Sequence, residues 1–253
     1  MGSILIVAEI QNGKIREASF ELVSVARKLA EAGGRDVRSV VIGHGVGQLA
    51  KDFASKGGGA TYVADDAALA NYNVDGYRKA IRAAVEASGA DLVLISNTPQ
   101  GWDVAPRIAA GLDAGFVSDC FKVEAKDGGL LFYRRVFNGR LDAQMSAQGR
   151  VVATLQPGAT DAYTGSSDGG TTPLAVDLAG VRSRFVAIKH AEATGVDLTK
   201  ADVIVSGGRG VGAPEKFPEV IEPLAKALGG AMGASRPVVD AGWLDHPYQV
   251  GSS

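Results

Sequence analysis

The sequence has 253 residues, of which 46% are hydrophobic and 21% charged, and its formal net charge is -2. This length is enough for one large domain or two smaller ones. The near-neutral charge excludes a general nucleic-acid or membrane-surface binder, because affinity for phosphate depends on clustered Lys and Arg.

Short apolar runs in the first hundred residues predict buried parallel strands, at residues 3–9, 37–43, 60–64 and 90–96. Between them, helical periodicity predicts core-facing stripes. The stripe residues are Leu22, Val25, Ala26, Leu29, Tyr77, Ile81, Ala84 and Val85. This order of elements, with a further helix at 101–113, predicts an α/β fold with a doubly wound parallel sheet and helices on both faces.

The alternation of predicted strands and helices ends at about residue 114. Four strand-like segments between 115 and 156, separated by the turn signals DGG and NG, predict an antiparallel extension of the sheet. Residues 163–173 have the composition of an exposed loop or linker, and 183–193 predict a further strand. We assign all of this to a first domain over residues 1–195.

A second domain is predicted over residues 196–253. It has a buried strand at 201–206, a glycine-rich turn, a helix beginning near Pro218, and a return to the sheet by 243. The expected helix stripe is Phe217, Val220, Ile221, Leu224, Ala227 and Leu228. We expect no closing strand, and two strands with one helix cannot cover both faces of a parallel sheet. This domain is therefore expected to be incomplete, either because further residues follow or because another chain completes the fold.

The single cysteine, Cys120, lies in an alternating stretch without a neighbouring His or cationic cluster, so we interpret it as a core residue. His44, His190 and His246 have no metal-ligand spacing and are interpreted as structural or surface residues. No apolar run approaches the roughly 20 residues that span a bilayer. The strand-like start leaves no room for a leader, so we expect a protein of the bacterial cytoplasm or a chain that has already been processed.

The glycine-rich turn, VSGGRGVG at 205–212, is the first candidate site. Glycines between a strand and a helix present backbone N–H groups that bind phosphate oxygens. Gly208, Gly210 and Ala213 match the dinucleotide-binding pattern loosely, and a turn without a ligand remains an alternative. Arg209 favours the phosphate site, because a guanidinium binds phosphate bidentately.

The second candidate site is GASRPVVDAGW at 233–243. Its strand ends in Ser235 and Arg236, where an NAD-binding fold carries an acidic residue, and this disfavours NAD. Arg236 could hold the 2′-phosphate of NADP, could be a solvated charge, or could face a flavin. Beside a flavin, a fixed positive charge stabilises the reduced, anionic forms.

These motifs, together with the ending QVGSS, resemble the FAD-binding domain of electron transfer flavoprotein alpha subunits. The segments ILIVAEIQNGKIREAS, GWDVAPRIAAGLDAGFVSD and RRVFNGR resemble the first domain of the same family, so the resemblance covers essentially the whole chain. It implies an adenine nucleotide alpha hydrolase-like first domain that docks on a beta subunit. An incomplete Rossmann-like FAD-binding domain would follow.

The resemblance also implies roles for single residues. Arg209 would contact the phosphate or adenosine of FAD, and Ser235 and Arg236 would lie against the isoalloxazine. Ser253 stands where the family has a threonine whose hydroxyl faces flavin N5, and a serine can donate the same hydrogen bond. The residues that match the start of this next FAD loop, usually VGQTG, are Val250, Gly251, Ser252 and Ser253.

In this family the protein relays electrons from flavin dehydrogenases to a quinone oxidoreductase or similar acceptor, and AMP is bound by the beta subunit. The family's chains continue with a GISGAIQHLAGM-like segment and a late Asn and Asp that complete the FAD site. Residues 1–253 alone are therefore expected to bind FAD poorly or not at all. The rival hypotheses are an NADP-dependent reductase that uses Arg236 and a scaffold subunit whose glycines only form turns.

Overall fold

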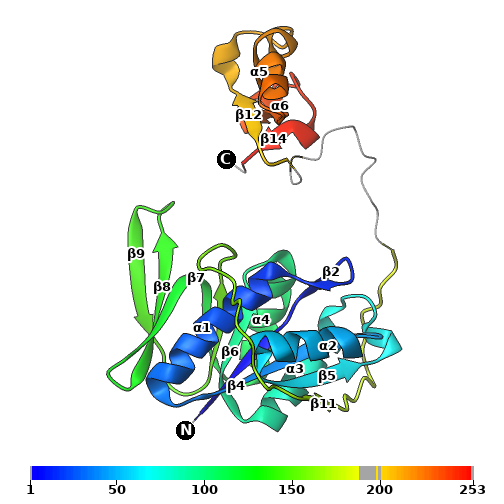
Figure 1. Ribbon diagram of the computed structural model, residues 1–253, viewed down its shortest axis with the longest axis vertical. Coiled ribbons are helices and arrows are strands. Elements are labelled where there is room, and N and C mark those ends of the chain that lie inside the picture. Colours follow the sequence, from blue (N-terminus) through cyan, green and yellow to red (C-terminus); the bar gives the residue numbers. More distant parts are fainter. Residues whose placement is uncertain (1, 188–197, 199–200, 252–253) are drawn as a thin grey trace. The chain divides into compact units, whose positions relative to one another are not determined.

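A computed structural model describes residues 2–187, 198 and 201–251 (Figure 1). The chain forms two compact units, Met1–Val186 and Ala187–Ser253. The domain boundary predicted between residues 195 and 196 falls outside the described residues and stays a prediction.

A nine-stranded sheet forms the centre of the first unit, in the order β11-β5-β4-β1-β6-β10-β7-β8-β9. Neighbours from β11 to β7 are parallel, while β7, β8 and β9 pair antiparallel. This confirms the predicted parallel sheet with an antiparallel extension. The strands are β1 Ser3–Val7, β4 Asp36–Gly43, β5 Ala60–Asp65, β6 Ala90–Ser96, β7 Gly115–Lys126, β8 Gly129–Val136, β9 Leu141–Ser146, β10 Val151–Leu155 and β11 Thr171–Pro173, with a small hairpin of β2 Ile10–Gln11 and β3 Lys14–Ile15.

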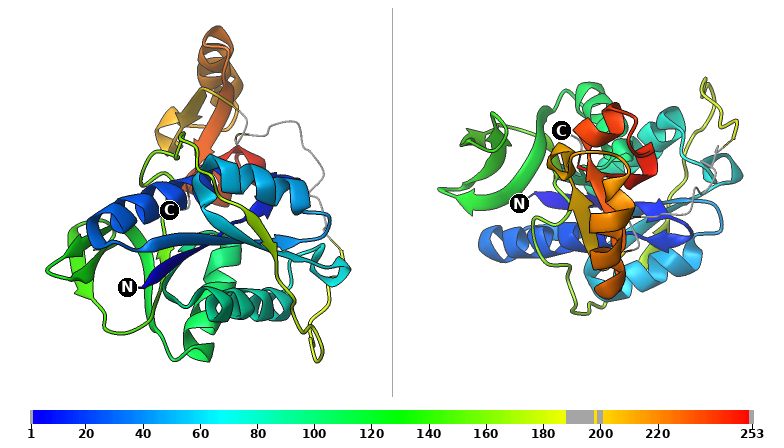
Figure 2. Two further views of the ribbon diagram at one scale, coloured as in Figure 1. Left: turned by 60° about the horizontal axis from the view of Figure 1, so that its bottom comes forward. Right: turned by 90° about the horizontal axis from the view of Figure 1, so that it is seen from above.

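Helices cover both faces of this sheet, as Figure 2 shows. The strand β1 is buried throughout and alternates: Ile4 and Ile6 face one core cluster, and Leu5 and Val7 face the other. Both predicted helix stripes are buried, one in each cluster, which confirms them. The helical elements of this unit are α1 Glu17–Gly33, α2 Gly47–Phe53, η1 Ala54–Gly58, η2 Ala67–Leu69, α3 Val74–Ser88 and α4 Pro99–Gly111.

The start of α4 is fixed by the residues that precede it. Thr98 caps the helix, because its Oγ1 accepts a hydrogen bond from the Gly101 N–H at 3.2 Å. The same hydroxyl donates to Oε2 of the buried Glu9 at 2.7 Å. Gly101 has to be a glycine, since a Cβ there would collide with the Ser96 carbonyl. The predicted helix at 101–113 is thus confirmed, beginning two residues earlier.

Three predictions for the first unit are wrong in part. The segment Val151–Leu155 is not antiparallel but lies between β6 and β7, parallel to both, because its five residues are all buried and suit a strand covered on two faces. The predicted loop at 163–173 ends in β11, an edge strand parallel to β5. Residues 183–187 form no strand, and the rest of that predicted strand lies outside the described residues.

The second unit is a small three-stranded parallel sheet, in the order β12-β13-β14. Phe217, Ala234 and Val238 form its buried core. Its elements are β12 Ile204–Gly207, η4 Arg209–Val211, η5 Phe217–Ile221, α5 Glu222–Ala227, β13 Ala231–Ser235, α6 Arg236–Asp240, η6 His246–Tyr248 and β14 Gln249–Val250. The expectation of no closing strand is wrong, because β14 pairs with β13.

The predicted helix stripe is also wrong in part. Phe217 is buried, but Val220, Leu224 and Leu228 are all more than half exposed. The reason is a π-turn: Pro223 has no N–H, and the Glu222 N–H donates to the carbonyl of Phe217, five residues back. The wider turn shifts the phase of the helix, so a 3.6-residue stripe cannot continue through it. The strand β12 is an edge strand with Ile204 exposed, not a buried strand.

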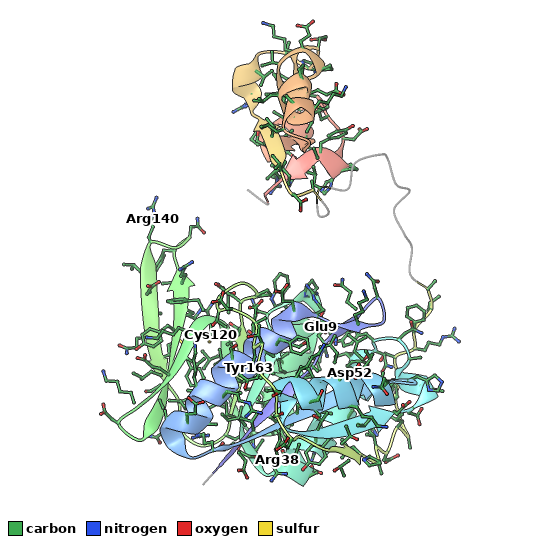
Figure 3. All side chains as sticks on the ribbon, in the orientation of Figure 1. Glu9, Arg38, Asp52, Cys120, Arg140 and Tyr163 are labelled. Atoms are coloured by element: carbon green, nitrogen blue, oxygen red, sulfur yellow. The ribbon has the colours of Figure 1, made fainter. Side chains whose placement is uncertain are left out.

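The isolated cysteine and two of the histidines lie as expected. Cys120 is fully buried in the first unit (Figure 3), and burial raises the pKa of its thiol to about 12. His44 and His246 are exposed, while His190 lies outside the described residues. Within the described part of the chain, no helix is both long and apolar enough to cross a bilayer.

Candidate functional site

The carboxyl ends of three parallel strands meet along one edge of the second unit. Gly207, the last residue of β12, pairs with Ala234, and Ser235, the last residue of β13, pairs with Val250 at the end of β14. The residues that follow these strands therefore lie at a common edge. In open α/β sheets, ligands bind in the crevice outside the carboxyl ends of the strands.

A tight turn follows β12 and contains Arg209. The Val211 N–H donates to the Gly208 carbonyl at 3.1 Å, and the Gly212 N–H donates to the Arg209 carbonyl at 3.0 Å. The turn is exposed along Gly208, Arg209 and Gly210. The next helical element begins at Phe217, which agrees with the helix predicted to begin near Pro218, so a loop separates the glycine cluster from that helix. The loop therefore exposes the backbone of the 3₁₀ turn η4, Arg209–Val211, and no helix N-terminus.

Nothing in the described part of the chain requires a glycine at position 210. A Cβ added there would meet no heavy atom within 4 Å, and its backbone is outside the left-handed region. Gly208 resembles it, since an added Cβ would make only an ordinary 3.7 Å contact with Ser235 Oγ. A ligand can approach the backbone closely only where no side chain fills the space, and both glycines leave that space open.

The strand β13 delivers Ser235 and Arg236 to the same edge. Ser235 is half-buried at the N-terminus of α6, and its hydroxyl makes no capping hydrogen bond to that helix. Arg236 is the first residue of α6 and is exposed, with its Nε 3.4 Å from Asp240 Oδ2. An exposed i,i+4 ion pair of this kind contributes only about 0.3–0.5 kcal/mol to stability.

The end of β14 completes the edge. Val250 is exposed beside Ser235, and Gly251 follows with a left-handed φ of 81°. The Gln249 Nε2 donates to the Gly251 carbonyl at 2.7 Å and fixes this bend. The predicted site residues Ser252 and Ser253 lie outside the described residues.

The structure thus brings five predicted residues to one edge: Arg209, Ser235, Arg236, Val250 and Gly251. Two guanidinium groups and an open glycine turn form a donor set that fits a dinucleotide cofactor with a pyrophosphate. Gly210 was only part of a loose pattern in the sequence. The signal that could have singled it out is the pair of glycines around Arg209.

The second unit coincides with a known domain. Residues 197–253 match the family model described as the electron transfer flavoprotein FAD-binding domain, and residues 4–180 match the electron transfer flavoprotein domain. The chain belongs to the electron transfer flavoprotein family. The match to the FAD-binding domain supports FAD as the cofactor of this flavoprotein chain, as predicted.

Curated relatives identify the subunit. The alpha subunit of Thermoanaerobacterium thermosaccharolyticum is 38% identical, over 99% of this chain and 78% of its own length. That of Syntrophomonas wolfei is 36% identical over 100% of this chain and 79% of its own, and that of Bacillus subtilis is 32% identical over 99% and 77%. This confirms the chain as an electron transfer flavoprotein alpha subunit. The roles of single residues stay predictions.

Proposed function

We propose that this chain holds FAD at the carboxyl edge of β12, β13 and β14 and relays electrons from flavin dehydrogenases to a quinone oxidoreductase or similar acceptor. The observation that carries the proposal is the register of the three strands, which puts the loop of Arg209, the Ser235–Arg236 pair and the bend at Gly251 on one edge. This edge lies within the segment matched by the FAD-binding family.

When bound, FAD supplies reversible uptake and release of electrons. The chain's own residues bind and orient it. The open backbone at Gly208 and Gly210 admits the pyrophosphate, and Arg209 neutralises part of its charge. Arg236, at the start of α6, places a positive charge that favours the reduced, anionic ring. The hydroxyl of Ser235, which α6 does not use, offers a hydrogen bond at the same place.

The relatives' names support a heterodimer, because they are called alpha subunits. We infer a beta subunit as the partner, docked on the first unit, with AMP bound in that partner and not in this chain. A cytoplasmic location belongs to the same proposal.

The test uses the natural full-length protein purified together with its beta subunit. We expect a yellow complex with flavin absorption, and in the variants Arg209→Ala and Arg236→Ala a roughly tenfold or greater loss of FAD affinity, because each loses a charge-assisted contact. Released FAD is quantified by absorbance after denaturation, and its affinity by fluorescence titration.

The matched control is Lys226→Ala, which removes an exposed cation of α5 that pairs with Glu222 at 2.8 Å. Its FAD content should equal that of the unmodified protein. A colourless complex that takes up no added FAD, or arginine variants with full flavin content, would contradict the proposal. A protein that binds NADP in place of a flavin would support the reductase hypothesis instead.

A further inference from the structure

A cavity lies in the first unit, apart from the residues of the proposed FAD site. It has a volume of about 370 Å³ and lies beside the carboxyl ends of β6 and β10. Two aromatic side chains in its lining are unusually exposed for their size, Trp102 at 60% and Phe116 at 39%. Its lining residues are Asn97, Trp102, Phe116, Ser118, Asp119 and Thr154.

The polar floor of this cavity is a closed ring of hydrogen bonds among three residues. The Asp119 N–H donates to Thr154 Oγ1 at 2.9 Å, and this hydroxyl donates to Asn97 Oδ1 at 2.8 Å. Asn97 Nδ2 then donates to Asp119 Oδ1 at 2.6 Å. Each member is held by the other two, so the carboxylate is preorganised.

The backbone is distorted at the same place. Asp119 has a φ of 60°, in the left-handed region that residues other than glycine rarely adopt. The pairing register of β7 against β10 shifts between Val117 and Cys120, and its register against β8 shifts just after, between Cys120 and Lys122. Bulges of this kind re-aim a side chain, and strained residues cluster at functional sites. Here the distortion points to a function for the Asp119 carboxylate.

Only Oδ1 of the Asp119 carboxylate takes part in this ring of hydrogen bonds. Among the described residues, Oδ2 accepts no hydrogen bond, and no Lys, Arg or His nitrogen lies within 4.0 Å of this carboxylate. Arg134, on the neighbouring strand β8, donates from Nη1 to Ser118 Oγ at 3.2 Å. A carboxylate without an ion-pair partner, in a cavity that aromatic side chains also line, repels anions and attracts cations.

We propose that this cavity binds a guanidinium group, with its N–H groups donating to Asp119 and its flat face stacked on Trp102. A guanidinium suits the cavity better than an ammonium, because it is planar, weakly hydrated and stacks on aromatic faces. Ser118 Oγ and Asn97 Oδ1 supply further acceptors at the same floor. The ligand class is an arginine side chain presented by a partner protein.

The test measures binding of N-acetyl-L-argininamide, with neutral N-acetyl-L-citrullinamide as its isostere, to the full-length complex. The chain has two tryptophans, Trp102 and Trp243, so the variant Trp243→Phe leaves Trp102 as this chain's fluorescent reporter. We expect a saturable change in the fluorescence of Trp102 at millimolar arginine derivative. The citrulline derivative should bind at least about tenfold more weakly.

Asp119→Asn removes the charge while keeping the side-chain shape, and asparagine tolerates the left-handed backbone. We expect about tenfold weaker binding of the arginine derivative and unchanged FAD content. The matched control is Asp113→Asn, an exposed aspartate that also has a left-handed φ, of 51°, and lies outside the cavity lining. That control should bind like the unmodified protein.

The proposal is overturned if the arginine derivative shows no saturable binding, if the citrulline derivative binds equally well, or if Asp119→Asn binds unchanged. Should Asp119→Asn fail to fold, as judged by circular dichroism, Trp102→Leu takes its place, because Trp102 is mostly exposed. Calorimetry then replaces fluorescence, and severalfold weaker binding is expected from the lost stacking. Unchanged affinity in that variant would also overturn it.

Discussion

At the scale of single residues, the glycines of the second unit are of two kinds. Some are required by the packing of the fold, and others leave bare backbone that is open to a ligand. A Cβ at Gly207 would meet Phe217 at 2.7 Å and Val211 at 3.0 Å, so this glycine is required for packing. A Cβ at Gly210 would meet nothing of the chain within 4 Å. The described part of the fold does not require a glycine at position 210, and its bare backbone leaves room for a ligand.

Two substitutions test this distinction. Gly210→Ala should leave the Tm of the cofactor-free protein nearly unchanged and weaken FAD binding, because the methyl group occupies space that the ligand needs. Gly207→Ala should destabilise the second unit by roughly 1–3 kcal/mol through overpacking. Thermal melts and FAD titrations measure the two effects. Full FAD affinity in Gly210→Ala would show that the ligand does not approach this turn.

At the scale of elements, patterns predicted the parts of the fold that depend on local sequence. Continuous apolar runs such as residues 90–96 correctly indicated buried parallel strands, because both faces of β6 are covered. The apolar pattern of a strand does not show which strands it pairs with, so the place of β10 between β6 and β7 was not predicted. The strand β14 was missed because two residues carry no detectable period.

The residues of the candidate site could be proposed from the sequence because their signals are local. Arg209 and Arg236 each follow a predicted strand, and this is visible in the sequence. That the ends of β12, β13 and β14 lie at one edge depends on their register, which only the structure supplies. The cavity at Asp119 was not predicted, because residues 97, 119 and 154 are distant in sequence and share no motif.

The segment after β11 is held on the first unit by polar contacts from α3. Lys79 Nζ donates to the carbonyls of Asp177 and Ala179 at 2.9 and 2.6 Å. Asp75 Oδ2 accepts from the N–H and the hydroxyl of Ser183 at 3.2 and 3.0 Å. These two hydrogen bonds hold the pKa of Asp75 below its ordinary value.

The lowered pKa sets the direction of a pH effect. Because the bound carboxylate is favoured, the contact is present above the ordinary pKa of an aspartate, about 3.9, and is lost as the pH falls through the lower value of the folded protein. Asp75→Ala should therefore increase hydrogen exchange at Ser183 at neutral pH, whereas the unmodified protein should show this only in acid. Equal protection of Ser183 in both proteins at neutral pH would contradict the assignment.

At the scale of the whole molecule, the two units differ in the size of their cores. The first unit buries two large apolar clusters, one on each face of its sheet. The buried cluster in the described part of the second unit has only three members, Phe217, Ala234 and Val238. Since each unit has its own core, each is expected to unfold as its own cooperative unit.

Calorimetry of the chain without its cofactor should accordingly show two transitions, with the second unit melting at the lower temperature. Added FAD should raise the lower transition and leave the upper one in place, because a ligand stabilises only the folded unit that binds it. A single transition, or an upper transition that moves with FAD, would show that the units do not unfold separately.

The outer edge of β12 has a consequence for handling the protein. Among the described residues β12 has a neighbour only in β13, and Val203 and Ile204 are each 38% exposed beside this open edge. Unpaired backbone groups next to β-branched side chains are a template on which a foreign strand can add. We expect concentrated, cofactor-free preparations to aggregate through this edge, and Ile204→Lys to keep them monomeric.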